Sequence, residues 1–484
     1  MSFFSSFSCR LSALCLVLGV AGNAVWGQID ADDLPELGDV ASTDLSMQAE
    51  KKIGQEIMNE IRRDAAYLDD PEIEAYLNRL GNRLAAASPD AGIGFHFFPV
   101  NDPMINAFAM FGGYIGVNAG LVLAVRNESE LAGVLAHEIS HVTQRHLARG
   151  IARQKQISGV TLMAIAAAIL AAHSNPDLAS ATMAGASAGA VQAQLGFSRD
   201  FEREADRIGF QILQKAGFDV RGMSSFFSRL QRATRVYENN APVYLRTHPL
   251  SVERISDMQN RELNQPYRQA PDSLEFLLTR ARLQAMRGTP DEAVTHFRAL
   301  LAEQKTLHVA ATRYGLAVAL ARKKDWAAAE TTLNALRQDK IASPMIDRLY
   351  AESRVRRGDA AGGLAAFREA LGRYPDAMAL IYGYGEALLE KRMFAEAQTF
   401  LTQSLRRNTG DARLYKLQAR AYAATGKMGL QHQALAEAYA LEGALPAAIE
   451  QLELAQRAKD NDFYTNSSID ARLRQLKQKQ AEAK

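Results

Sequence analysis

The stretch Leu135-Ala-His-Glu-Ile-Ser-His-Val-Thr-Gln-Arg-His146 lies in an apolar run that begins near Glu128 and favours a helix. It contains the pattern His137-Glu138-x-x-His141. Side chains four positions apart lie one above the other on a helix, so the two imidazoles can converge on one metal ion. Glu138 would then lie about a quarter-turn away, beside a coordination position left open for water.

These residue types suit zinc chemistry. Neutral imidazoles hold Zn²⁺ without cancelling its charge, and zinc with an open position lowers the pKa of its bound water to roughly 7. A carboxylate beside that water, here Glu138, can take its proton and later pass it to the leaving amine. The alternative is a helix with two surface histidines and a solvated glutamate. Apolar neighbours instead predict a buried helix whose histidines need partners; these neighbours are Leu131, Val134, Leu135, Ile139 and Val142.

A four-coordinate site needs a third protein ligand. A nearby histidine in the metzincin manner is not expected, because Gln144 and Leu147 stand where that pattern has Gly and His. His146 would fall nearly opposite His137 on a continuous helix. That position predicts either a surface residue or one that supports a ligand from behind.

The better candidate for the third ligand lies downstream, in a second stretch that favours a helix, Phe197-Ser-Arg-Asp-Phe-Glu-Arg-Glu-Ala-Asp-Arg-Ile-Gly-Phe210. Glu202 and Asp206 stack four apart on this helix. We expect Glu202 to bind the metal and Asp206 to accept the outer N–H of a ligating histidine, which fixes its tautomer. Glu204 lies on another face and is expected to be solvated.

Three motifs together resemble the zinc endopeptidase family that includes the HtpX heat-shock protease and the CAAX prenyl protease. They are His137-Glu138-Ile-Ser-His141, the Glu202-x-x-Ala205-Asp206 helix and Asn106-Ala-Phe-Ala-Met-Phe-Gly-Gly-Tyr-Ile115. The resemblance covers roughly residues 45 to 260, and the soluble, secreted, repeat-bearing members are most similar. It implies a zincin-type peptidase with one Zn²⁺ per chain, and clients that are outer-membrane beta-barrel proteins and their assembly machinery.

The segment from Asn106 to Asn118 carries Gly112-Gly113 between β-prone residues, which predicts a strand, a kink and a second strand. By resemblance this segment borders the cleft, with Gly112 and Gly113 in contact with substrate. Its edge would pair with an extended substrate backbone. A plain structural hairpin is the alternative.

Further along, Thr247-His248-Pro249 matches a segment found near the zinc in this family. Pro249 biases His248 toward an extended geometry, from which the ring can project inward. Two roles stay open: hydrogen-bonding the oxyanion of the tetrahedral intermediate, or filling the open zinc position in a resting state. A helix-capping or loop histidine is the alternative. Arg254 is a candidate for orienting a nearby carboxylate.

The N-terminal 27 residues are typical of a cleavable secretory signal, with Arg10 before an apolar run from Leu11 to Val20 and small residues after it. That run is too short to span a bilayer. Both cysteines, Cys9 and Cys15, would leave with the signal, which suits the periplasm. Before the metal motif, the pattern predicts helices from Met47 to Ala66 and Asp70 to Ala86 and a strand from Gly94 to Val100.

Charge and composition narrow the partners. Fifty-six basic and 54 acidic side chains give a net charge of +2, so nucleic acid is not expected as a partner. Residues 157–196 combine a run without charge and a run rich in small residues. We expect a helical hairpin there that serves as a lid, a peripheral membrane contact or a partner contact. A buried core hairpin is an equal alternative.

From about Leu274 the sequence repeats with a period of 34 residues, typical of tetratricopeptide (TPR) repeats. Turn positions fall at Gly288, Lys324, Gly358, Arg392 and Gly426, and small residues follow five positions later at Ala293, Ala329, Gly363 and Ala397. We therefore expect an α+β, mostly α chain. A signal peptide over 1–27, a zinc metallopeptidase domain over 28–268 and an α-solenoid of helix pairs over 269–484 follow from these patterns.

Together these observations predict a secreted zinc metalloendopeptidase, and the resemblance implies that it acts in the periplasm and also has chaperone-like activity. His137, His141 and Glu202 would bind zinc, Glu138 would be the general base and acid, and His248 would assist or gate. The repeats carry no catalytic groups and would recognise clients or dock on a larger assembly. The competing hypothesis is a non-proteolytic scaffold or chaperone whose zinc site is structural or latent.

Overall fold

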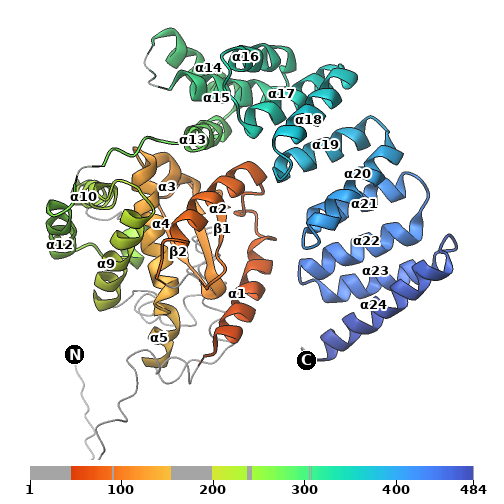
Figure 1. The fold of residues 1–484 in the computed structure, drawn as a ribbon, viewed down its shortest axis with the longest axis horizontal. Helices are drawn as coiled ribbons and strands as arrows, with labels where there is room; N and C mark the ends of the chain where they lie inside the picture. Colours follow the sequence, from red (N-terminus) through yellow and green to blue (C-terminus); the bar gives the residue numbers. More distant parts are fainter. Residues whose placement is uncertain are drawn as a thin grey trace, which may run out of the picture.

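The computed structural model describes residues 45–89, 92–153, 199–236, 243–266, 268–304, 306 and 308–482. Its N-terminal part is a small sheet surrounded by helices, and its C-terminal part is an arc of helix pairs (Figure 1). This arrangement confirms the predicted α+β, mostly α class. Among the described helices, none is both long and apolar enough to cross a membrane. The predicted signal peptide, the hairpin predicted over 157–196, and Phe197 and Ser198 at the start of the second helical stretch lie outside the described residues.

In the N-terminal part, two helices precede the three strands along the chain and the other helices follow them. They are α1 (Met47–Ile61), α2 (Pro71–Ala85), α3 (Ala119–Ala124), α4 (Glu128–Thr143), α5 (His146–Arg153), α9 (Arg199–Lys215), α10 (Arg221–Val236), α11 (Val243–Thr247) and α12 (Val252–Leu263). The first of these ends five residues before its predicted end, because the Asp64 side chain accepts a hydrogen bond from Ala66 N at 2.7 Å and holds a turn. The predicted cap is confirmed: Asp70 accepts from Glu72 N and Ile73 N, with Pro71 at the first helical position.

The sheet has three strands in the order β1-β3-β2. β1 (His96–Val100) is parallel to β3 (Tyr114–Asn118), and β2 (Ala107–Ala109) is antiparallel to it. The outer edge of β1 is covered, because the Asn78 side chain of α2 donates to Phe97 O at 2.7 Å and accepts from Phe97 N at 3.0 Å. β2 forms the opposite edge of the sheet and packs against α4, the helix that carries His137, Glu138 and His141.

Gly112 and Gly113 form the predicted kink between β2 and β3, in the single helical turn η2 (Phe111–Gly113). Their φ angles are 74° and 84°, in the left-handed region that favours glycine. A Cβ on Gly113 would lie 2.3 Å from Gly94 O, and one on Gly54 of α1 would lie 2.0 Å from Phe111 O. The turn is therefore packed tightly between α1 and the start of β1.

The two metal-motif helices cross in the core. The Asn127 side chain caps α4 by accepting from Glu130 N at 2.9 Å, and nearly the whole helix is buried. α9 approaches it at Gly209, where an added Cβ would lie 3.1 Å from His137 N. That close approach brings the first turns of α9 against the histidines of α4. α9 ends at Lys215, and Gly217 two residues later has a φ of 83°.

The C-terminal part is a solenoid of paired helices. They are α13 (Leu274–Met286), α14 (Pro290–Ala302), α15 (Val309–Arg322), α16 (Trp326–Gln338), α17 (Pro344–Arg357), α18 (Ala360–Arg373), α19 (Met378–Glu390), α20 (Phe394–Arg407), α21 (Ala412–Ala423), α22 (Met428–Leu441), α23 (Leu445–Arg457) and α24 (Phe463–Glu482). The first helix begins a few residues after the boundary predicted at 269, which stays a prediction.

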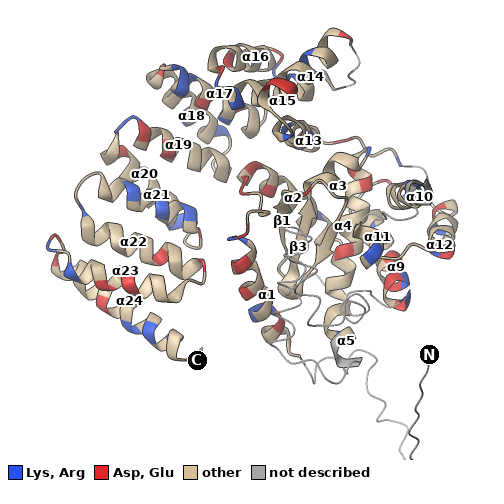
Figure 2. Ribbon diagram, turned by 180° about the vertical axis from the view of Figure 1, so that it is seen from behind, with Lys and Arg blue, Asp and Glu red and all other residues tan. Residues whose placement is uncertain are grey.

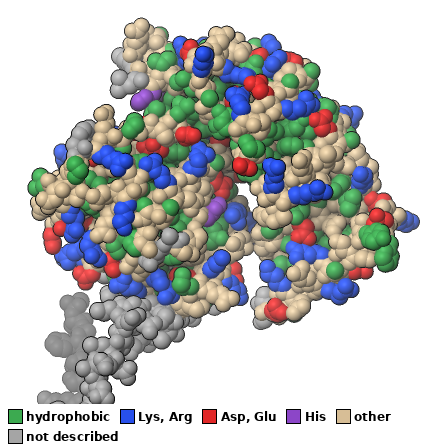
Figure 3. Space-filling view, viewed as in Figure 1, with side chains coloured by type: hydrophobic (Ala, Val, Ile, Leu, Met, Phe, Trp, Pro, Cys, Tyr) green, Lys and Arg blue, Asp and Glu red, His purple; other side chains and the backbone are tan. Residues whose placement is uncertain are grey.

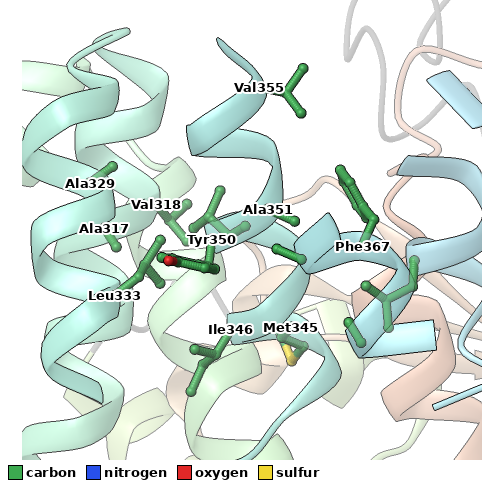
Figure 4. Packing of buried hydrophobic residues seen from close by; sticks show 14 of the residues in the cluster. Ala317, Val318, Ala329, Leu333, Met345, Ile346, Tyr350, Ala351, Val355 and Phe367 are labelled. Carbon is green, nitrogen blue, oxygen red and sulfur yellow. The ribbon is translucent and has the colours of Figure 1, made fainter. Parts of the chain in front are cut away.

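The predicted repeat pattern has a clear structural basis. All five predicted turn positions have positive φ: Gly288, Lys324, Gly358, Arg392 and Gly426. The small residues allow paired helices to approach, since a Cβ on Gly363 would lie 2.5 Å from Val355 Cγ2. Figure 4 shows how Ala317 and Val318 of α15, Leu333 of α16 and Tyr350 of α17 face one another in the resulting core. Each turn and each small position therefore serves the stacking of helix pairs.

A buried charge cluster joins the two parts where α2 begins. Arg282 of α13 lies 2.7 Å from Asp70 and 3.1 Å from Glu72, and Arg348 of α17 lies 2.7 Å from Glu72. The Tyr314 hydroxyl of α15 is 3.4 Å from Glu72 Oε2. Acidic and basic residues are brought together there from segments far apart in the sequence (Figure 2). We call these five residues the interdomain anchor.

The far arm of the solenoid touches the peptidase part more lightly. Arg63 Nη2 donates to Glu442 O at 3.2 Å, and the exposed pair Arg413 and Asp69 is separated by 3.4 Å. On the face shown in Figure 3, a narrow opening separates the two parts between these contacts and the anchor. The solenoid is thus held firmly at one end of its arc.

Candidate active site

Four buried side chains converge between α4, α9 and the loop after α11. His137, His141, Glu202 and His248 each offer a ligand atom, and these atoms all lie within 4.8 Å of one another. His137 Nε2 is 3.0 Å from His141 Nε2 and 3.4 Å from His248 Nδ1. Glu202 Oε1 is 3.0 Å from His248 Nδ1 and 3.5 Å from His141 Nε2. Three imidazoles and one carboxylate therefore point at a common centre.

The donor set fits a metal ion. His137 Nδ1 lies 3.0 Å from Asp206 Oδ1, so Nδ1 faces outward and Nε2 is the atom that a metal ion would bind in place of a proton. Ring nitrogens without protons are all acceptors, so they cannot hydrogen-bond to one another at these distances. A metal cation between them would interact favourably with each one. Imidazole nitrogens and one carboxylate are common ligands of a divalent transition metal.

Glu138 points at the same centre from α4. It is fully buried, and neither of its carboxylate oxygens has a hydrogen-bond partner among the described residues. His248 Nε2 is 3.5 Å from Glu138 Oε1, and the backbone of Ala109 at the end of β2 also faces this carboxylate. Burial raises the pKa of Glu138 above its ordinary value. The group is therefore a stronger base than an exposed glutamate.

Asp206 and Arg254 support the cluster from behind. Arg254 Nε lies 2.6 Å from Asp206 Oδ2, and its Nη1 lies 2.7 Å from Glu202 Oε2. Burial alone would raise the pKa of Asp206, but hydrogen bonds from Arg254 and His137 hold it below its ordinary value. For His137, burial opposes the cation, yet hydrogen bonds to Asp206 and Glu202 raise the pKa to about 9. Both carboxylates thus stay charged beside the histidines.

His248 reaches the cluster from the loop that follows α11. Its ring packs on Tyr244, with centroids 4.7 Å apart and planes tilted by 30°, and Tyr244 in turn stacks on Phe227 at 5.9 Å. The Tyr244 hydroxyl is buried and has no hydrogen-bond partner among the described residues. Sequence reasoning missed Tyr244, although its position four residues before His248 on a short helical turn is a usable signal.

The placement of His146 on the surface is wrong, and its alternative role as a residue that supports a ligand from behind stays a prediction. His146 is fully buried and its Nδ1 lies 2.8 Å from His141 Nδ1. The reason is Arg145, whose φ of 52° ends α4 and redirects the chain into α5. Glu204 is partly buried rather than solvated, because its Oε2 lies 3.0 Å from His146 Nε2.

Gly112 and Gly113 lie in the packed turn next to β2, and their contact with substrate stays a prediction. The sheet edge near the cluster is β2, whose neighbour α4 carries Glu138. His96 is partly buried and lies on β1 with its Nε2 3.3 Å from Glu74 Oε1. It is not part of the cluster.

Comparison with known proteins agrees with this geometry. The model of Peptidase family M48 matches residues 70–262, and tetratricopeptide repeat models match residues 278–344 and 354–421. A beta-barrel assembly-enhancing protease from Yersinia pestis is 33% identical over 470 residues, covering 96% of each chain. The protein of the same name from Escherichia coli (strain K12) is 33% identical over 459 residues, covering 93% of this chain and 92% of its own.

A putative beta-barrel assembly-enhancing protease from Vibrio cholerae is 40% identical over 270 residues, which is 56% of each chain. The two full-length matches extend across both the peptidase part and the solenoid. The family model spans α2 to α12 and therefore contains all four converging residues. The chain belongs to the M48 family of metallopeptidases, among the beta-barrel assembly-enhancing proteases with C-terminal tetratricopeptide repeats.

Proposed function

We propose that this chain is a periplasmic zinc metalloendopeptidase that degrades or assists misassembled outer-membrane beta-barrel proteins and has chaperone-like activity. The observation that carries the proposal is the convergence of His137, His141, Glu202 and His248 around the unpaired carboxylate of Glu138. The names of the full-length relatives support the client class. The signal peptide over 1–27 supports secretion into the periplasm.

His137, His141 and Glu202 would hold one Zn²⁺ per chain. When bound, zinc polarises the scissile carbonyl and lowers the pKa of water at its open position. Asp206 Oδ1 lies 3.0 Å from the outer nitrogen of His137, and Arg254 Nη1 lies 2.7 Å from Glu202 Oε2. Burial alone would raise the pKa of Glu202, but His248 and His137 hold it well below its ordinary value. These contacts hold the ligand atoms in place before substrate arrives.

Glu138 acts as the general base and then as the general acid. Its carboxylate is held in a dry site with no hydrogen-bond partner among the described residues, so it can accept a proton from water and deliver it to the leaving amine. The raised pKa that burial causes brings Glu138 closer to the value at which a group can both take and return a proton near neutral pH.

His248 gates this site. Its Nδ1 lies within 3.4 Å of His137 Nε2 and 3.0 Å of Glu202 Oε1, which is where a fourth ligand would bind. A zinc site with four protein ligands is closed, whereas one with three leaves room for water. Movement of the loop that carries His248 would open the site, and the ring could then donate a hydrogen bond to the oxyanion.

An extended client segment would pair with the edge of β2. Backbone pairing along a strand edge gives affinity without demanding a particular sequence, which suits clients recognised by misassembly. Gly112 and Gly113 would bound this site at the end of the strand. The solenoid would hold the client or dock on the outer-membrane assembly machinery, and residues 157–196 are proposed as a lid or peripheral membrane contact.

The competing function is a non-proteolytic scaffold with a latent site, which His248 in the fourth position favours. Degradation of an unfolded protein by the zinc-loaded chain distinguishes the two, using the unaltered chain, Glu138→Gln and His248→Ala. If the unaltered and His248→Ala chains cut and Glu138→Gln does not, the site is a peptidase. A faster His248→Ala chain identifies this histidine as a gate. If none cuts while all bind the unfolded protein, the scaffold function holds.

A further inference from the structure

His146 and Glu204 form a chain of contacts that ends on the metal-site residue His141. His146 Nδ1 lies 2.8 Å from His141 Nδ1, and His146 Nε2 lies 3.0 Å from Glu204 Oε2. Arg149 Nη1 lies 3.0 Å from the same carboxylate oxygen. His146 is fully buried, so these contacts are shielded from competing water. Neither His146 nor Glu204 belongs to the converging cluster itself.

One arrangement of protons satisfies both hydrogen bonds that link His141, His146 and Glu204. A His141 that offers its Nε2 lone pair to a metal carries its proton on Nδ1, and that N–H must donate to His146 Nδ1. His146 then carries its own proton on Nε2 and donates it to Glu204 Oε2. A doubly protonated His146 would set two N–H groups against each other.

The position of His146 is fixed by packing as well as by hydrogen bonds. Its ring lies flat on Phe201 of α9, with centroids 4.4 Å apart and planes within 8°. The Arg149 guanidinium lies 4.8 Å from the centroid of the Phe201 ring. The left-handed backbone of Arg145 separates α4 from α5 and places His146 at the first position of α5. Backbone and stacking therefore present Nδ1 of His146 to His141 in a single orientation.

We infer that His146 and Glu204 are a positioning pair that fixes the tautomer and ring orientation of His141 for metal binding. The pair corresponds to Asp206 and Arg254, which do the same for His137. Each proposed histidine ligand of α4 thus has its own partner on the side away from the metal. Asp206 contacts His137, and His146, which itself contacts Glu204, contacts His141. The inference rests on the proposed function in that it assigns the metal to His141.

Metal affinity of the full chain tests this pair directly. After removal of metal by a chelator, the Zn²⁺ dissociation constant is measured by competition with an indicator of known affinity. His146→Phe keeps the stacking on Phe201 but removes the acceptor, and we expect affinity to fall about 10- to 100-fold. His146→Asn restores an acceptor in the place of Nδ1 and should recover most of that loss. Glu204→Leu, at a partly exposed position, should weaken affinity less than His146→Phe.

The matched control is His96→Phe, which breaks another histidine–glutamate pair, with Glu74 at 3.3 Å, outside the cluster. It should leave Zn²⁺ affinity unchanged. Unchanged affinity in His146→Phe and Glu204→Leu would overturn the inference, as would equal losses in His146→Phe and His146→Asn. If His146→Phe does not fold, the Zn²⁺ dissociation constants of Glu204→Leu and His146→Asn still test the inference. Failure of the unaltered chain to bind Zn²⁺ would instead overturn the proposed function.

Discussion

The molecule holds two buried clusters of charged and titratable groups, and they are completed in different ways. In the interdomain anchor, Asp70 and Glu72 face the guanidinium groups of Arg282 and Arg348, so the acids and bases neutralise each other. In the active-site cluster, three imidazoles and the Glu202 carboxylate converge on a common centre, and the buried Glu138 has no Lys or Arg partner among the described residues. A cluster closed by its own partners serves structure, whereas one left open is built for a ligand.

The pKa directions of the carboxylates separate the two clusters further. Burial alone would raise the pKa of Asp70, but Arg282 lowers it below its ordinary value. Burial raises the pKa of Glu138, and His248 and His137 do not reverse that shift. Glu138 is therefore costly to hold in its charged form, which is the property that a general base requires.

The largest expected effect comes from Glu138→Gln. Loss of the general base should reduce cleavage of an unfolded protein about 10²- to 10⁴-fold. Because this carboxylate is buried without a partner, the midpoint of thermal unfolding should stay the same or rise. Glu60→Gln, at an exposed position on α1, is the control for both measurements. A large fall in the unfolding midpoint of Glu138→Gln would show that Glu138 is a structural residue.

The next largest effect is expected in the anchor, where Arg348→Met leaves Glu72 short of a partner. Breaking a buried ion pair from one side should lower the free energy of unfolding by about 3–5 kcal/mol in urea titrations. Combining it with Glu72→Gln should recover part of the loss. Arg413→Met removes an exposed pair between the same two parts and should cost about 0–1 kcal/mol. Equal losses in Arg348→Met and Arg413→Met would contradict a dominant role for the anchor.

The contribution of the ionised Asp70 carboxylate to stability should depend on pH. Because its pKa is lowered in the folded chain, its contribution is present above the unfolded-state value of about 3.9 and is lost as the pH falls through the folded value. Asp70→Asn keeps an N-cap acceptor for α2 but removes the charge. The variant should lose stability relative to the unaltered chain at pH 7, and the difference should shrink below about pH 4. A difference that is independent of pH would contradict this contribution.

The smallest expected effect is in Tyr314→Phe. The hydroxyl is buried at 3.4 Å from Glu72 Oε2, so its removal should lower the free energy of unfolding by about 0.5–1.5 kcal/mol. Cleavage activity should not change, because Tyr314 lies in the anchor. A change in the Zn²⁺ dissociation constant of this variant would show that the anchor and the active site are coupled.

Much of the active site follows from spacing along single helices. His137, His141, Glu202 and Asp206 are separated in pairs by four residues, and a helix places such pairs on one face. The solenoid is predicted for a similar reason, because a turn recurs with the repeat and each turn position has a left-handed backbone. These features are local in sequence, so periodicity reveals them.

The features that sequence reasoning did not find depend on breaks in that periodicity or on long separations. His146 is misplaced when the helix is extended through Arg145, because a positive φ at a non-glycine residue carries no clear sequence signal. The anchor joins Glu72 to Arg282 and Arg348, more than 200 residues away. Charges that alternate along solvated helices cannot be told from these buried ones without the fold.

The most direct test of the open cluster is X-ray absorption at the zinc edge, which counts imidazole ligands. We predict three imidazoles on zinc in the unaltered chain, from His137, His141 and His248, and two in His248→Ala. The His96→Phe chain should keep three. Zinc with fewer than two imidazoles, or a count that does not change in His248→Ala, would contradict the assignment of this cluster as a gated metal site.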